Sequence, residues 1–151
     1  MNRKELIGSG SKIGRVAAPF LMAGVILNIL APSLFSVGGP SAGLKAISIV
    51  IVITGVVIWM WSGVLILKKV PRKELITNGP YSVVKHPLYT AVALLVLPWI
   101  GILFNTWLGV LIGIVVYIGS RIYSPEEEKL LSRTFGNSWD EYCNKVKIPW
   151  I

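Results

Sequence analysis

The longest uncharged stretch of the chain constrains its fold more than any other feature. Between Ala46 and Leu67 there are 22 consecutive residues without a charged side chain. As an α-helix this stretch is about 33 Å long, which is enough to cross a bilayer whose hydrocarbon core is about 30 Å thick. The chain of 151 residues is 54% hydrophobic, and its apolar residues are grouped in blocks. We therefore predict an all-α integral membrane protein.

The other apolar blocks raise the expected number of transmembrane helices to four. The predicted spans are about 16–36, 46–67, 88–104 and 107–122. Only Asn105 and Thr106 separate the last two spans, so these spans should form a tight helical hairpin. Gly109 and Gly113, spaced four apart in the last span, predict close contact with a neighbouring helix.

Basic residues are distributed very unevenly around the predicted spans. If the N-terminus is cytoplasmic, residues 1–15, 68–87 and 121–151 lie on the cytoplasmic side and hold 4, 5 and 5 Lys or Arg, whereas only Lys45 lies opposite. This asymmetry predicts cytoplasmic termini, in the plasma membrane of a prokaryote. On this topology the net charge of +8 reflects the orientation of the chain in the membrane, and it also favours contact with anionic membrane lipids. We therefore expect no nucleic-acid partner.

On this topology the chain is one domain, residues 1–151, with a cytoplasmic loop at 68–87 and a cytoplasmic tail at 123–151. The single cysteine, Cys143, allows no intramolecular disulfide. With one histidine and one cysteine the chain offers no zinc-ligand cluster, and we predict no metal site. It also has no glycine-rich phosphate loop and no serine nucleophile elbow.

The only histidine lies where the loop meets the third predicted span. The triplet Asn78-Gly79-Pro80 interrupts any helix, and Pro87 suits the first turn of the next helix. His86 should therefore cap or immediately precede this helix. A lone histidine at such a place is more often a solvated interfacial residue than a catalyst, so its meaning depends on its surroundings.

The tail begins with the signals of a separate amphipathic helix. Ser124 is the expected N-cap, Pro125 the first helical residue and Gly136 the residue just past the end. A second short helix is expected from Ser138 to about Val146. One face of the first helix is mostly apolar and the opposite face is charged; the apolar face holds Leu130, Leu131, Thr134 and Phe135, and the charged face holds Glu126, Lys129 and Arg133.

Two acidic residues of this helix turn toward its apolar face. Glu127 lies in the middle of that face and Glu128 flanks it. One interpretation is a capping box, in which Glu127 reaches back to the backbone N–H of Ser124. The other is that a carboxylate facing the bilayer needs a cationic partner, which His86, Lys85 or a cationic ligand can supply.

The loop and tail motifs together resemble a known family. "GPYSVVKHPLYTA" and "EEEKLLSRTFGNSWDEYCNKV" look like the motifs of the isoprenylcysteine carboxyl methyltransferases and the related phospholipid N-methyltransferases. The matching residues are Gly79, Tyr81, His86, Pro87, Tyr89, Glu127, Glu128, Leu131, Phe135, Gly136 and Tyr142. The resemblance covers about half of the chain, from residue 79 to residue 146.

The resemblance implies an S-adenosylmethionine site built by the loop, the helical hairpin and the tail helix. It implies cofactor-binding roles for Gly79, Tyr81, Lys85, His86, Pro87, Tyr89, Glu127, Glu128 and Leu131. His86 and Glu128 are the candidate catalytic bases for an amine acceptor, and Arg121 is the candidate group for binding an acidic one. A carboxylate can hold the cofactor's ammonium group, and tyrosine rings can face its sulfonium and adenine.

Three positions depart from the family pattern. Lys85 stands where the family has arginine, so a planar two-pronged grip on a carboxylate is replaced by a point charge. Ala91 replaces a glycine, and Trp139 replaces a tyrosine. The last two changes keep small size and aromatic character, whereas the first puts specificity for a carboxylate in question.

The expected activity is methyl transfer to a small lipophilic acceptor, either like an isoprenylcysteine carboxylate or like a phospholipid amine. Two alternatives remain: an NADPH-dependent reductase of the membrane sterol type, and a non-enzymatic lipid-binding protein. The phosphates of NADPH call for several arginines, and only Arg72, Arg121 and Arg133 lie near the expected site. The oligomeric state and the physiological role do not follow from the sequence.

Overall fold

The computed structural model describes residues 8–148, and all regular elements of this part are helices. In chain order they are α2 (Gly8–Leu30), α3 (Pro32–Phe35), α4 (Ala42–Lys69), η1 (Val70–Arg72), η2 (Gly79–Ser82), α5 (Pro87–Thr90), η3 (Ala91–Val96), α6 (Leu97–Leu103), α7 (Leu108–Phe135) and α8 (Asn137–Lys145). The all-α prediction is confirmed. Arg3 and Lys4, which belong to the expected basic asymmetry, and residues 149–151 of the expected tail lie outside the described residues.

Within residues 8–148, three helices are long and apolar enough to cross a membrane: α2 from Gly10 onward, α4 with the adjoining η1, and α7. The helix over Pro87–Leu103, formed by α5, η3 and α6, is apolar but shorter. Many large apolar side chains point outward, such as Leu30 at 75% exposure. Such exposure would be unfavourable in water, but it suits a surface in contact with lipid.

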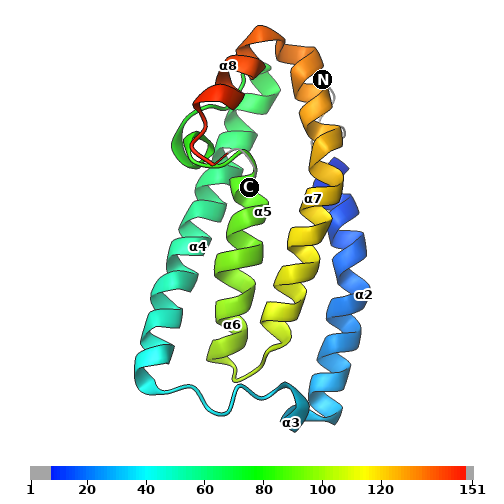
Figure 1. Ribbon diagram of the computed structural model, residues 1–151, viewed down its shortest axis with the longest axis vertical. Coiled ribbons are helices and arrows are strands. Elements are labelled where there is room, and N and C mark those ends of the chain that lie inside the picture. Colours follow the sequence, from blue (N-terminus) through cyan, green and yellow to red (C-terminus); the bar gives the residue numbers. More distant parts are fainter. Residues whose placement is uncertain (1–7, 149–151) are drawn as a thin grey trace.

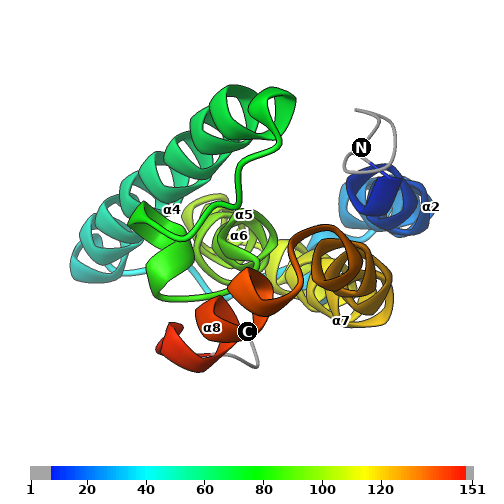
Figure 2. The same cartoon turned by 90° about the horizontal axis from the view of Figure 1, so that it is seen from above.

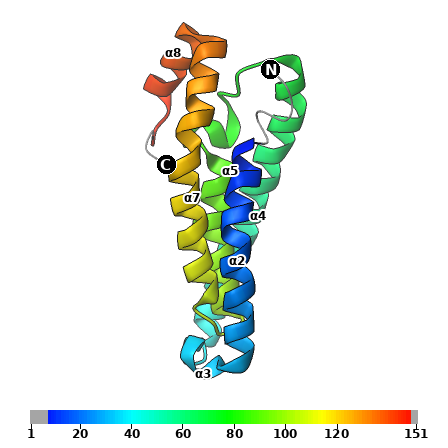
Figure 3. The ribbon, with the colours of Figure 1, turned by 90° about the vertical axis from the view of Figure 1, so that its right-hand side faces the viewer.

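The long helices stand side by side in an open row (Figures 1 and 3). The central position is taken by α5, η3 and α6, with α4 packed on one side and α7 on the other, and α2 packs against α7. Seen from above, α8 lies on one face of this row, beside α5 and between α4 and α7, near the loop that leads from α4 to α5 (Figure 2). The loop and the tail, which the sequence places on one side of the membrane, are therefore at the same end of the molecule.

Small residues allow α4 to approach the central helix closely. Ser48, Gly55 and Ser62 are buried and lie seven residues apart on one side of α4. A Cβ atom placed on Gly55 would come within 2.7 Å of the Cβ of Leu95. Both serine hydroxyls donate hydrogen bonds to carbonyls of their own helix, at 2.8 Å for Ser48 and 2.7 Å for Ser62, so neither buried hydroxyl lacks a partner.

The predicted hairpin of the last two spans is present and very tight. The amide of Thr106 donates a 2.8 Å hydrogen bond to the carbonyl of Gly101, which closes the turn between α6 and α7. A Cβ atom on Gly109 would lie 2.1 Å from the carbonyl oxygen of Leu97 and 2.8 Å from the Cα of Gly101. The close packing predicted from Gly109 and Gly113 is thus confirmed, since a Cβ on Gly113 would also meet a backbone carbonyl, at 2.5 Å.

The helix expected to begin at Ser124 does not begin there. Instead α7 runs without interruption from Leu108 to Phe135, with Pro125 inside it. Ser124 is 6% exposed, and its hydroxyl has no hydrogen-bond partner among residues 8–148, so the predicted N-cap and capping box are wrong. Proline costs one hydrogen bond to the carbonyl four residues earlier, but the helix continues past it, and Glu126 and Glu128 just after it form ion pairs with α2 and with the loop. The end at Gly136, with φ of 50°, is as predicted.

We predict that Gly109→Ala destabilises the protein by about 1–3 kcal/mol, because the added methyl group collides with backbone atoms that cannot rotate away. The matched control is Gly63→Ala on α4, where a Cβ meets nothing within 4 Å. Thermal unfolding of both variants in detergent measures the difference. Equal melting temperatures for the two variants would contradict the observed hairpin packing.

Candidate active site

The loop after α4 contains a glycine in a left-handed backbone conformation. Gly79 begins the short helix η2 and has φ of 63°, a conformation that other residues rarely adopt. A Cβ atom there would also come within 3.0 Å of the indole ring of Trp61. Pro80 follows in the first turn of η2. This local geometry places Tyr81 on the inner side of the loop.

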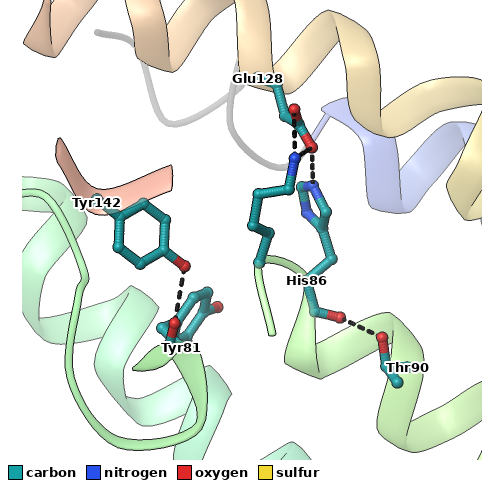
Figure 4. Close-up of polar contacts among 6 residues, drawn as sticks. Tyr81, His86, Thr90, Glu128 and Tyr142 are labelled. Carbon is teal, nitrogen blue, oxygen red and sulfur yellow. Dashed lines mark hydrogen bonds and ion pairs between the residues drawn. The ribbon is translucent and has the colours of Figure 1, made fainter. Parts of the chain in front are cut away.

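His86 lies just before α5, as predicted, but its side chain does not cap the helix. Its backbone carbonyl instead accepts two hydrogen bonds from Thr90, from the amide at 3.1 Å and from the hydroxyl at 3.0 Å. The imidazole is 11% exposed and points toward α7, where its Nε2 lies 3.0 Å from Oε1 of Glu128 (Figure 4). Its ring also stacks with Tyr89, with 6.3 Å between ring centres.

Glu128 holds two nitrogen groups of the loop at once. Besides His86, it binds the ammonium of Lys85, whose Nζ lies 2.7 Å from Oε1 and 2.8 Å from Oε2. Lys85 is 15% exposed and Glu128 28%, so the contacts are shielded from much of the solvent. Two donors on one carboxylate stabilise its ionised form. Because an ionised carboxylate only accepts hydrogen bonds, Nε2 of His86 must carry the hydrogen.

The two glutamates before Glu128 have different surroundings. Glu126 forms an ion pair with Lys12 of α2, and the ammonium of Lys12 also lies 5.7 Å above the ring of Tyr123. Glu127 faces the space between α7 and the loop. Successive helical residues are rotated by about 100°, so the three adjacent carboxylates point in three different directions.

Helix α8 folds back over this region and is fixed to the loop at two points. The hydroxyl of Tyr142 donates a 2.8 Å hydrogen bond to the backbone carbonyl of Tyr81 (Figure 4). The amide of Ile148 donates one of 2.9 Å to the carbonyl of Val83. Tyr142 and Trp139 are buried, with ring centres 5.4 Å apart. The tail therefore covers the outer side of the loop.

A pocket whose lining includes several charged side chains lies between the end of α4, the loop, α7 and α8. Its cavity volume is about 50 Å³, below the range of about 300–1,000 Å³ that is usual for small-molecule sites, and the space including its open mouth is about 490 Å³. Its lining combines apolar, aromatic and charged side chains: Ile66, Glu74, Leu75, Ile76, Tyr81, Lys85, His86, Glu127, Leu131, Phe135, Trp139 and Tyr142.

The two tyrosines of the pocket remain protonated at neutral pH. Burial, and then the negative charge of Glu127, raises the pKa of the Tyr81 phenol well above its usual value. Burial is also the main reason that the pKa of the Tyr142 phenol is raised. The Tyr81 hydroxyl is thus a hydrogen-bond donor inside the pocket, next to a carboxylate.

An apolar groove lies on the other side of η2. Its volume is about 1,020 Å³ including its open side, and its lining is almost entirely apolar: Ile58, Trp61, Gly79, Pro80, Ser82, Val83, Val84, Pro87, Thr90, Ala91 and Leu95. One wall is the π-helical segment η3, where the amide of Leu97 bonds to the carbonyl of Val92 and Pro98 has no amide to donate. The groove and the pocket share η2 as a common wall.

The structure brings most of the residues expected at the site together. Tyr81, Lys85, His86, Glu127 and Leu131 line the pocket, and Glu128 contacts two of them. The other expected residues lie around it: Tyr89 beside His86, and Gly79 and Pro87 in the groove.

Arg121 is exposed on α7 and is not among the residues that line the pocket.

The sequence did not identify four residues that line the pocket: Glu74, Ile76, Ile66 and Trp139. The apolar pair Leu75-Ile76 within an otherwise basic loop was the available signal, because such a pair needs a place to be buried.

The fold and the pocket define a helical membrane protein with a pocket lined partly by charged side chains at one end of its apolar helices. Comparison with protein families makes the class definite, since the model of the isoprenylcysteine carboxyl methyltransferase (ICMT) family matches residues 44–133. The chain belongs to this family of membrane methyltransferases. The matched range includes His86 and all three glutamates of α7, but neither α2 nor α8. No curated protein and no solved structure matched the chain.

We predict that Tyr142→Phe loosens α8, because the carbonyl of Tyr81 then loses its donor at a cost of about 1–3 kcal/mol. Hydrogen–deuterium exchange of the α8 amides should become faster, while the transmembrane helices stay protected. The control is Tyr117→Phe, at a residue that packs in a separate cluster around Ile13 and Val116. Unchanged exchange in α8 would show that the hydrogen bond does not fix the helix.

Proposed function

We propose that the protein transfers the methyl group of S-adenosylmethionine to a small lipophilic acceptor held in the membrane. The observation that carries this proposal is the shared wall between the pocket with its charged side chains and the apolar groove. A polar methyl donor and an apolar acceptor need two different environments, and their reacting atoms must meet. Only the thickness of η2 separates the two environments here.

The residues of the pocket fit S-adenosylmethionine chemically. Glu127 offers a carboxylate for the ammonium group of the cofactor, and the rings of Tyr81, Trp139 and Tyr142 offer aromatic faces for its sulfonium and adenine. Gly79, Lys85, His86, Pro87, Tyr89, Glu128 and Leu131 would complete or support this site. Family members are methyltransferases, which generally use this cofactor, so the fit and the family agree.

When bound, the cofactor supplies a methyl carbon attached to a positively charged sulfur. The protein's own contribution is alignment and the exclusion of water. Helix α8 covers the pocket through Tyr142 and Trp139, which are both buried. Glu128 fixes the position of the His86 ring, and the hydroxyl of Tyr81 provides a donor beside Glu127. The role of Arg121 as an anion-binding group finds no support, because it is not among the lining residues.

The acceptor's apolar part fits the groove, which borders the pocket and lies between α4 and the central helix. Its lining by Ile58, Val83 and Leu95 is suited to a hydrocarbon chain, since each buried CH₂ contributes about 0.8 kcal/mol. We also propose that the shorter helix over Pro87–Leu103 is the third of four transmembrane spans. The loop and the tail then face the cytoplasm.

Cysteine accessibility tests this topology. After Cys143→Ser, a single cysteine at Ser138 on α8 should react with a membrane-impermeant reagent only from the cytoplasmic side. A single cysteine at Ser41, just before α4, should react only from the opposite side. This follows from the basic asymmetry, which places the loop and tail residues inside. Labelling of position 41 from the cytoplasm would overturn the four-span arrangement.

Titration of the purified protein in detergent with S-adenosylmethionine and with NADPH tests the proposed function directly. Binding of S-adenosylmethionine alone supports the methyltransferase. Binding of NADPH alone supports the reductase, and binding of neither supports a non-enzymatic lipid-binding protein. The described lining of the pocket contains no arginine, which favours the first outcome over the second.

We predict that Glu127→Gln weakens the binding of S-adenosylmethionine by roughly 1.5–3 kcal/mol, the value of a charge-assisted hydrogen bond. Glu126→Gln is the matched control, because Glu126 faces Lys12 and is 66% exposed in its side chain. This change should have little effect on binding. Isothermal titration of both variants measures the difference, and equal small losses would refute the assignment of Glu127 to the cofactor.

A further inference from the structure

We propose that the group methylated at this site is an amine of a membrane lipid and not a carboxylate. This inference rests on the proposed function and deepens it by naming the chemical class of the acceptor. The first observation is the ion pair between Lys85 and Glu128.

Lys85 is the only lysine or arginine in the described lining of the pocket. Its ammonium contacts both oxygens of Glu128, at 2.7 and 2.8 Å. A carboxylate acceptor needs a cation that gives up its existing partner, and it would be placed next to the negative charge of Glu128. Lysine also lacks the two-pronged geometry with which arginine can bind two carboxylates at once.

The remaining charges of the lining also disfavour an anionic acceptor. Glu74 also lines the pocket, and its carboxylate would repel an acceptor carboxylate, whereas Glu127 is assigned above to the ammonium group of the cofactor. An amine, by contrast, is attracted to this surface as an ammonium ion. The lining therefore selects for a basic head group before any chemistry occurs.

An amine must lose a proton before it can attack, and His86 is placed to take that proton. In the neutral form of the ring, Nε2 donates its hydrogen to Glu128 and Nδ1 is left as the acceptor. Glu128 thus acts as a positioning residue, because it sets both the tautomer of His86 and the location of Lys85.

The proposed methyl transfer conserves atoms and charge. The ammonium gives one proton to Nδ1 of His86, and the nitrogen lone pair forms a bond to the methyl carbon of the sulfonium donor. The bond between that carbon and sulfur breaks, and its electron pair stays on sulfur. The products are a methylated ammonium lipid, a neutral thioether and a protonated imidazole, which returns its proton to water.

Two probes that differ only in their head group test the inference: hexadecylamine and hexadecanoate. Each is titrated into the purified protein in detergent without a methyl donor, and the dissociation constants are compared. We expect the amine to bind at least about tenfold more tightly, the effect of one charge-assisted contact. With labelled S-adenosylmethionine, the amine should gain an alkali-stable methyl group, and the acid should form little alkali-labile methyl ester.

The Glu128→Gln variant supplies a readout that a purely structural role would not change. It frees Lys85 and removes the anchor of His86, so the preference for the amine should fall by about tenfold or reverse. The control is Glu126→Gln, whose carboxylate pairs with Lys12 on α2, and this variant should keep the wild-type preference. If Glu128→Gln fails to fold, the wild-type comparison of the two probes still decides.

Tighter binding or faster methylation of hexadecanoate by the wild-type protein would overturn the inference and leave the proposed function standing. Equal dissociation constants for the two probes, or no binding of either probe, would also overturn the inference. S-adenosylmethionine is titrated into the same preparation as a separate measurement. If that ligand does not bind, the proposed function itself fails.

Discussion

The contact of one carboxylate with two loop residues holds the candidate site together. Glu128 lies on α7, whereas Lys85 and His86 come from the loop that follows α4, so this contact joins parts of the chain that are more than 40 residues apart. All three side chains are at least partly shielded from water, which strengthens the attraction between their charges. Without it, the loop would be held only by the hydrogen bonds from Tyr142 and Ile148, and the His86 ring would be oriented only by its contact with Tyr89.

The transmembrane part of the fold was largely predictable because the bilayer permits few solutions. Backbone groups in lipid must be bonded within a helix, so long apolar blocks such as residues 46–67 have one outcome. The error came at Ser124-Pro125, where every local signal indicated a helix start. Local capping preferences are worth only about 1 kcal/mol. The loop residues Lys85 and His86 were expected as partners of an acidic residue here, but the ion pair of α7 with α2 had no signal in the sequence. Tertiary contacts therefore decided the outcome.

The candidate site was predictable where a motif marked it and not elsewhere. His86, Tyr81 and Glu127 were expected together and do lie around one pocket, although their roles in binding remain predictions. Glu74 and Ile66 also line it, but nothing in their local sequence distinguishes them, because they reach the pocket only through the fold of the loop. Arg121 was expected from its place in the chain, yet the direction of a side chain on a helix depends on packing that sequence position alone does not fix.

The three glutamates of α7 show how one helical turn can serve three purposes. They have the same chemistry, and only the rotation of about 100° per residue separates them. Glu126 therefore meets Lys12 of α2, Glu127 faces the pocket, and Glu128 meets the loop. A helix that started at Ser124 would place these residues in its frayed first turn, whereas a continuous α7 holds them in fixed directions. The hydrogen bond that Pro125 cannot make is thus a small cost against the fixed placement of all three carboxylates.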